Sequence, residues 1–174
     1  MKKIGKFPST RLRRVRNSDW IRRLISENNL SVNDLIMPVF VREGKKIREK
    51  IKTMPGIYRY SLDLLPKVVG EAARLGIPMI ALFPCTPNSK KDKQGSEALN
   101  ENNLICKSIK TIKKRFKEIG IMTDIALDPY TNHGHDGIIK NGYVDNDLTI
   151  EILSKQSILQ ASMGADVIAP SDMM

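Results

Sequence analysis

Four short apolar runs recur along the chain, and each has the length of a β-strand. They cover residues 35–41, 78–83, 121–127 and 166–169. Runs that are apolar at nearly every position are typical of strands buried on both faces, as in parallel sheets. We therefore predict four buried strands, although Pro38 is awkward in the first, because proline cannot donate a hydrogen bond to a strand ladder.

The stretches between these runs carry apolar residues at the spacing of amphipathic helices. The predicted helices cover residues 61–76, 100–119 and 148–163, and glycines supply their stop signals. A shorter helix is predicted to follow Ser18 and to end at Asn28 and Asn29. The polar segments 42–52 and 130–147 are predicted to be loops.

A strand, a loop and a helix thus repeat three times, which indicates an α/β protein with a parallel sheet covered by helices. The alternatives are an open doubly wound sheet and a (β/α)8 barrel. No GxGxxG follows the first strand, so a dinucleotide-binding fold has no specific support. Four strands are half of a barrel. We predict a partial TIM barrel, the first four βα units over residues 34–174, preceded by an arm and short helix over 1–33.

Charge adds a question about partners. The net charge is +10, and residues 1–23 hold nine lysines and arginines against one aspartate, a net +8. A basic RNA-binding module would fit that charge, but it would need exposed aromatic residues for base stacking, and aromatics are only 5% of the chain. The alternative is an extended arm, residues 1–16, that docks on a neighbouring subunit. We expect no nucleic-acid partner.

The same composition limits where the protein works. No apolar run approaches the roughly 20 residues of a membrane span, and no apolar signal segment follows the basic start. Cys85 and Cys106 form no CxxC pair and are expected to be reduced thiols, as in the cytoplasm.

Ionisable residues gather at the end of the third predicted strand and in the loop that follows it. They are Asp124, Asp128, His133, His135 and Asp136, and they include both histidines of the chain. Strand ends carry the functional residues in α/β folds, and these side chains are able to ligate Mg²⁺, Mn²⁺ or Zn²⁺. The plainer alternative is an Asx-rich turn whose side chains cap their own backbone.

Five segments in order resemble the porphobilinogen synthase family. They are RLRRVRNSDWIRRLISENNLSVNDLIMPVFVREG, MPGIYRYSLDLL, ALFPCTP, DIALDPYTNHGHDG and GADVIAPSDMM. The resemblance implies a hydro-lyase that joins two molecules of 5-aminolevulinate into porphobilinogen with loss of two waters, in tetrapyrrole and haem biosynthesis. It also implies a TIM barrel whose arm embraces a neighbour in a homo-oligomer, commonly an octamer.

Site residues follow from the same resemblance. Asp124 matches the family's active-site aspartate, and Ser171 matches a serine of the substrate pocket. The three zinc-binding cysteines of some members are replaced here by Ala126, Asp128 and Asp136. The resemblance therefore implies the aspartate-type branch, associated with Mg²⁺ or a monovalent cation, and zinc is not expected.

The family's two Schiff-base lysines are expected beyond Met174. An imine-forming lysine must be largely neutral, which requires burial or a neighbouring cation. The lysines of this chain fall in polar loops or on solvated helix faces, and none is expected at a strand end. We therefore expect the 174 residues alone to be a truncated, inactive part of the enzyme. The alternative is a non-catalytic assembly partner of a full-length synthase.

Overall fold

The structure is a computed structural model that describes residues 5–173. The first four residues of the predicted arm, and Met174, lie outside the described residues. The chain divides into two compact units, residues 1–31 and 32–174. Among the described helices, none is long and apolar enough to cross a bilayer.

The first unit contains η1 (Arg14–Arg16) and α1 (Asp19–Leu24). Helix α1 starts after Ser18, as predicted, but it ends at Leu24, well before Asn28. None of the described residues in this unit is buried. A short helix that buries none of its side chains has little to extend it, because most helical stability in proteins comes from tertiary contacts.

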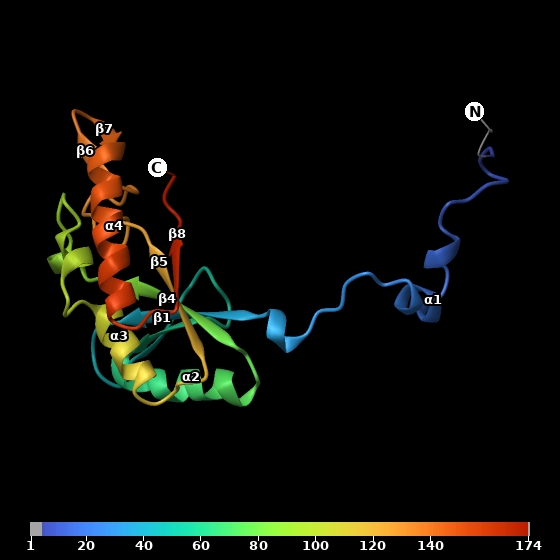
Figure 1. Ribbon diagram of the computed structural model, residues 1–174, viewed down its shortest axis with the longest axis horizontal. Coiled ribbons are helices and arrows are strands. Elements are labelled where there is room, and N and C mark those ends of the chain that lie inside the picture. The colour runs from blue at the N-terminus through green and yellow to red at the C-terminus, as the bar shows by residue number, and fades with distance from the viewer. Residues whose placement is uncertain (1–4, 174) are drawn as a thin grey trace. The chain divides into compact units, whose positions relative to one another are not determined.

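The second unit is built on a six-stranded sheet with the order β2-β3-β1-β4-β5-β8. The four predicted strands are neighbours in this sheet and pair in parallel, so the predicted α/β architecture is confirmed (Figure 1). Their bounds are β1 Ile36–Arg42, β4 Met79–Cys85, β5 Gly120–Ile125 and β8 Val167–Pro170. The sheet is open over the described residues, with β2 and β8 as its outer strands.

The prediction of a loop over 42–52 was wrong. Strand β2 (Arg48–Lys50) pairs antiparallel with β3 (Tyr58–Ser61), and β3 extends the sheet beyond β1 by parallel pairing from Phe40 onward. The first predicted strand therefore does not form the sheet edge along its whole length. Pro38 lies before the β3 pairing begins, at a position with a strand on one side only, which proline tolerates.

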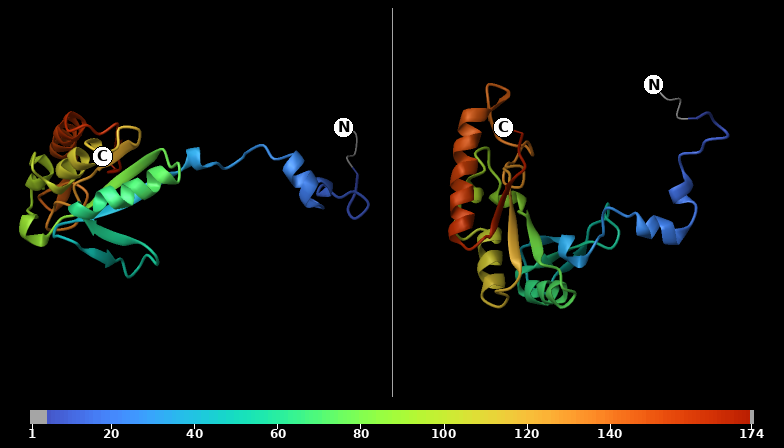
Figure 2. Two further views of the ribbon diagram at one scale, coloured as in Figure 1. Left: turned by 90° about the horizontal axis from the view of Figure 1, so that it is seen from below. Right: turned by 45° about the vertical axis from the view of Figure 1, so that its right-hand side comes forward.

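Three helices cover one face of the sheet (Figure 2). They are α2 (Leu65–Arg74), α3 (Leu104–Lys113) and α4 (Asn146–Ser162). Alternate strand residues such as Val39, Leu82 and Ile121 pack in a core with α2 and α3. Further along the sheet, Ile125 and Ile168 pack with Leu153 of α4. The strand residues that alternate with these core residues, including Asp124, lie on the opposite face of the sheet.

Two helix ends agree with the glycine signals and one does not. Gly76 and Gly164 follow α2 and α4 with positive φ of 79° and 107°, a conformation that glycine adopts without strain. Helix α3, however, begins after Asn103, whose side chain accepts a hydrogen bond from the Cys106 N–H, and it ends at Lys113. Gly120 is instead the first residue of β5.

Short elements fill the connections. Four single 3-10 turns lie at η2 Val32–Asp34, η3 Leu62–Leu64, η4 Asn88–Lys90 and η5 Ser96–Leu99. The predicted loop 130–147 contains a hairpin of β6 (Ile138–Lys140) and β7 (Tyr143–Asp145). Asn141 and Gly142 form its turn with positive φ at both residues, as two-residue hairpins require.

Candidate active site at the strand ends

Strand register places a row of side chains across the helix-free face of the sheet. Phe40 of β1 pairs with Arg59 of β3 on one side and with Phe83 of β4 on the other. Because Leu82 pairs with Thr123, the next residues, Phe83 and Asp124, also lie side by side. The rings of Phe40 and Phe83 stack with centroids 5.5 Å apart. The row therefore runs from a cation over two aromatic rings to the Asp124 carboxylate.

A cavity of about 310 Å³ opens over this row at the carboxyl ends of the strands. We call it the mouth cavity. Besides the row, its walls include Lys91, Asp128, and Cys85 at the end of β4. The cavity thus combines an apolar floor with both signs of charge, which suits a small polar ligand.

Three aspartates meet beside this cavity. Asp128 follows β5, Asp136 lies in the loop after it, and Asp172 follows β8. One carboxylate oxygen from each lies within 4.8 Å of the other two. This aspartate cluster brings together two residues singled out from the sequence, Asp128 and Asp136, and adds Asp172.

The cluster is electrostatically crowded. Burial, together with the negative charges of Asp136, Asp128 and Asp124, raises the pKa of Asp172 to about 6. Burial, followed by the charges of Asp136 and Asp124, also raises the pKa of Asp128, whereas the Lys91 ammonium lowers it. Carboxylates so arranged attract a proton or a cation.

The donor set of the cluster fits a hard cation. Carboxylate oxygens are the ligands that Mg²⁺ prefers, whereas structural zinc sites rely on thiolates and imidazoles. Among the described residues, neither a cysteine nor a histidine joins the cluster. Ala126, at the remaining signature position, is buried, and its side chain has no ligating atom.

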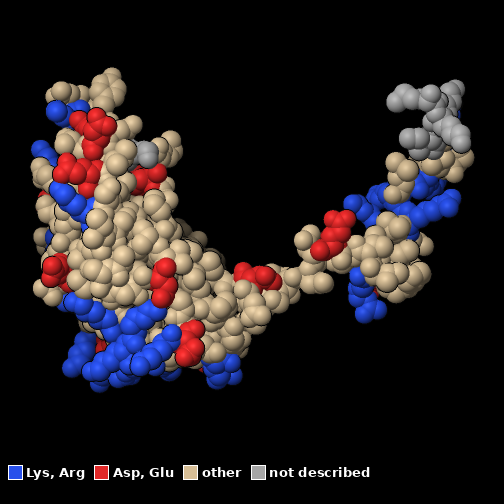
Figure 3. Space-filling model, in the orientation of Figure 1, with Lys and Arg blue, Asp and Glu red and all other residues tan. Residues whose placement is uncertain are grey.

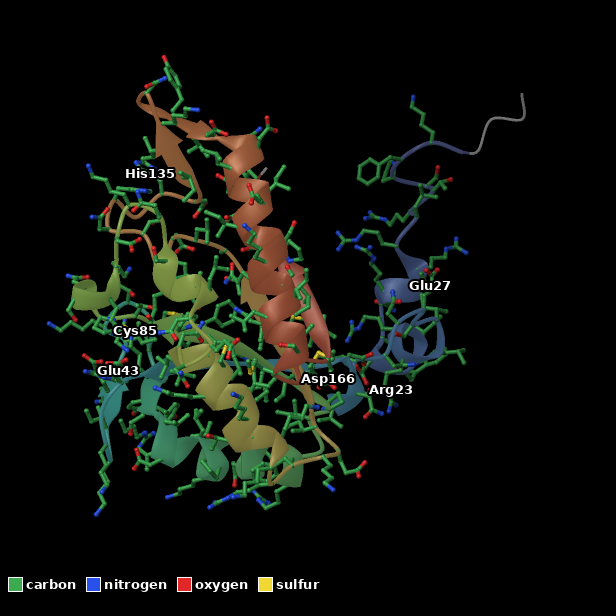
Figure 4. All side chains as sticks on the ribbon, turned by 60° about the vertical axis from the view of Figure 1, so that its left-hand side comes forward. Arg23, Glu27, Glu43, Cys85, His135 and Asp166 are labelled. Carbon is green, nitrogen blue, oxygen red and sulfur yellow. The ribbon has the colours of Figure 1, made fainter. Side chains whose placement is uncertain are left out.

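The two histidines lie elsewhere. The His135 N–H donates to Nδ1 of His133 at 3.1 Å, and the two ring centroids are 5.7 Å apart. His135 is exposed, and Figure 4 shows it well apart from Cys85 at the strand end. The two histidines therefore lie in a local turn, which was the alternative interpretation of this segment.

Ser171 stands directly after β8. Its backbone N–H donates to the Ile125 carbonyl at 3.3 Å, which continues the pairing of β8 with β5 past the strand end. Its side chain is exposed. The serine therefore lies one residue from the aspartate cluster, at the end of the strand next to that of Asp124.

None of the four parallel strands β1, β4, β5 and β8 ends in a lysine. Lys91 nevertheless reaches the mouth cavity from the loop after β4. Its Nζ lies 3.5 Å from the Asp128 carbonyl oxygen. Sequence reasoning missed Lys91, Arg59 and Asp172, because each enters through a loop or a strand whose position only the fold determines.

The basic surface of the second unit lies away from this site. Lysines and arginines gather over α2 and the C-terminal end of α3 (Figure 3). There Lys113 pairs with Asp166, which stands just before β8, at 2.5 Å. This is the amino end of the strands, opposite to the mouth cavity.

The chain is similar to known proteins of one family. The family model for delta-aminolevulinic acid dehydratase matches residues 9–174. A delta-aminolevulinic acid dehydratase of Bradyrhizobium diazoefficiens is 50% identical over 164 residues, which are 94% of this chain and 46% of the relative. That of Chlamydia pneumoniae is 48% identical over 95% of this chain and 50% of the relative.

A solved structure is also similar. The crystal structure of delta-aminolevulinic acid dehydratase (porphobilinogen synthase) from Toxoplasma gondii, in complex with the reaction product porphobilinogen, superposes with a TM-score of 0.89 and 39% identity. The match covers 95% of this chain and 47% of that one. The chain spans about half the length of the relatives described here.

Proposed function

The chain belongs to the delta-aminolevulinic acid dehydratase family, and from this premise we propose that it supplies part of a site that condenses two molecules of 5-aminolevulinate into porphobilinogen. The observation that carries the proposal is the mouth cavity, where Asp124 lies in one row with two stacked phenyl rings at the strand ends. The reaction forms one C–C and one C–N link and releases two waters.

Each part of the cavity has a role in this proposal. The substrate is a short chain with an ammonium group at one end and a carboxylate at the other. Asp124 accepts hydrogen bonds from the ammonium, and Phe40 and Phe83 pack against the methylene carbons and exclude water. Ser171 offers a hydroxyl from the neighbouring strand end. These contacts hold and orient substrate, and orientation alone contributes a large part of the rate in a two-substrate reaction.

Ligand binding to the chain tests the proposal. We expect porphobilinogen to shift the backbone amide resonances around Asp124, Phe83 and Ser171. D124N should weaken this binding about 10–100-fold, because a hydrogen bond to a charged group contributes roughly 1.5–3 kcal/mol. D147N, which changes an exposed aspartate in the first turn of α4, is the matched control. Unshifted resonances at millimolar ligand would refute the proposed site.

A cation is the second part of the proposal. The aspartate cluster would hold Mg²⁺, or a monovalent cation, through Asp128, Asp136 and Asp172. Such an ion supplies positive charge beside the reacting substrate. The crowding of carboxylates within 4.8 Å supports this assignment, because a bound cation relieves their mutual repulsion.

Assembly is the third part. We propose a homo-oligomer, an octamer on the family resemblance, in which the arm contacts another subunit. The first unit leaves large apolar side chains in the open, including Leu12 at 84%, Leu24 at 76% and Trp20 at 61% exposure. Exposed apolar groups of this size are typical of interaction sites. The free thiols Cys85 and Cys106 suit a reducing cytoplasm.

Deletion of residues 1–16 is expected to lower the oligomeric state. The deletion removes the basic charge and the exposed Phe7, Leu12 and Val15, which would otherwise be covered by a neighbour. Light scattering coupled to size exclusion measures the mass directly. Substitution of Arg11 and Arg13 by lysine, which keeps the charge and the apolar side chains, should leave the mass unchanged. An unaltered mass after the deletion would contradict the role of the arm.

A further inference from the structure

The loop after β4 is fastened on both sides of Lys91. On one side, Lys90 pairs with Glu43 at 2.5 Å and with Glu97 at 3.4 Å. On the other side, the Asp92 N–H donates to the Tyr130 carbonyl at 3.3 Å, and the Asn132 N–H donates to the Asp92 carbonyl at 3.0 Å. These bonds tie the loop to the signature segment, so the backbone at Lys91 has little freedom.

Asp92 is itself held in place. Its Oδ1 accepts hydrogen bonds from the backbone N–H groups of Gln94 at 2.9 Å and Ser96 at 3.0 Å. The two neighbours of Lys91 are thus engaged with the rim of the site, whereas Lys91 extends into the mouth cavity with Asp124 and Asp128. A fixed backbone on each side makes this direction of the side chain a property of the fold.

Lys91 also differs from the other cation of the cavity. Arg59 has a carboxylate partner other than Asp124 and Asp128, since its guanidinium lies 3.8 Å from Glu49. Among the described residues, Lys91 makes no carboxylate ion pair within 4.0 Å, and its Nζ lies 3.5 Å from the Asp128 carbonyl oxygen. The positive charge of Lys91 therefore faces Asp124 and Asp128 and is not neutralised by a separate ion pair.

We propose that Lys91 is a positioning residue, the built-in counter-ion of Asp124 and Asp128, held over them by the anchored loop. This inference rests on the proposed function, because it gives the cavity a fixed positive charge that keeps those carboxylates in place for substrate. It has a second consequence. A divalent cation entering the aspartate cluster meets the ammonium as a competitor, so Lys91 lowers the cation affinity of the site.

A double-mutant cycle in EDTA tests the counter-ion role without any cation. The variants are K91M, D128N and their combination, and the readout is the melting temperature. D128N retains the backbone carbonyl, so the cycle isolates the carboxylate charge. In the K91M background, D128N should raise the melting temperature by about 2–4 °C more than it does in the wild type. Without the Lys91 ammonium, D128N loses no favourable attraction and removes only the repulsion between Asp128 and the other aspartates.

Lys93 supplies the matched control. It lies in the same loop, is exposed, and lines a different cavity with His133. K93M should show no coupling to D128N, and K91R should restore the wild-type behaviour. Absent coupling for Lys91, or equal coupling for Lys93, overturns the inference. If D128N does not melt cooperatively, D124N takes its place in the same cycle.

Calorimetric titration with Mg²⁺ is the second measurement. Removal of one positive charge from the neighbourhood of the ion should tighten binding on the order of 10-fold in K91M and leave K93M unchanged. Equal affinities in K91M and wild type overturn the inference. Absence of Mg²⁺ binding in every variant refutes the cation proposal instead, and the cycle in EDTA still decides on Lys91.

Discussion

The 174-residue chain is expected to form no porphobilinogen from 5-aminolevulinate and to yield no imine that borohydride can trap. Imine formation needs an unprotonated amine that attacks the substrate ketone. A lysine with an ordinary pKa of about 10.4 is roughly 99.9% protonated at pH 7. A lysine becomes neutral through burial away from carboxylates or beside another cation.

The lysine closest to the proposed site lacks such surroundings. Lys91 is only half-buried and lines the mouth cavity with Asp124 and Asp128, and the described lysines outside this loop line other surfaces. The sheet is also open over the described residues, so it supplies only one side of the barrel pocket that the family resemblance implies. Substrate is therefore expected to bind weakly to Asp124 and its neighbours and to remain unchanged.

The measurement is direct. The purified chain is incubated with 5-aminolevulinate, Mg²⁺ and K⁺, treated with borohydride, and examined by colorimetric assay and mass spectrometry. A full-length delta-aminolevulinic acid dehydratase, such as that of Bradyrhizobium diazoefficiens, is the positive control. Product above background, or a reduced adduct on a lysine of this chain, contradicts the expectation, and K91M then shows whether Lys91 carries the adduct.

Hydropathy predicted the strands that are buried on the helix face and missed the short strands that polar contacts hold in place. The run 78–83 became β4, because each of its apolar side chains gains from burial. Strand β2, with the sequence Arg-Glu-Lys, gains almost nothing from burial and exists because β3 offers backbone partners. The β6–β7 hairpin did carry a signal, the Asn141-Gly142 turn, which the loop interpretation of residues 130–147 overlooked.

The sequence predicted those site residues that lie close together along the chain. Asp124, Asp128 and Asp136 fall within 13 consecutive residues, and their grouping follows from one strand end and its loop. Asp172 is 36 residues further along the chain, and only the pairing of β5 with β8 brings it to Asp128. Lys91 was unpredictable for a different reason, because its direction depends on the bonds that hold Lys90 and Asp92.

The double substitution D128N/D136N is expected to weaken Mg²⁺ binding to the chain on the order of 100-fold or more. Each substitution replaces an anionic oxygen ligand by a neutral amide, and the attraction between a cation and a carboxylate in direct contact contributes several kcal/mol near a protein surface. Asp172 would be the one remaining carboxylate of the cluster. A single carboxylate binds Mg²⁺ weakly, because this ion gives up its water ligands reluctantly. Calorimetry with Mg²⁺, and electron paramagnetic resonance with Mn²⁺ as a probe, measure the loss.

The control is D147N, which removes one negative charge from an exposed helix position and should leave the affinity unchanged. Wild-type affinity in the double variant would place the ion elsewhere.

Zinc is the metal that is expected not to bind at these positions. Thiolates give zinc its high affinity in proteins, and the signature positions here are Ala126, Asp128 and Asp136. Elemental analysis should therefore find no stoichiometric zinc after dialysis, and zinc held by the wild type but lost in D128N/D136N would show that these carboxylates form a site of a different kind.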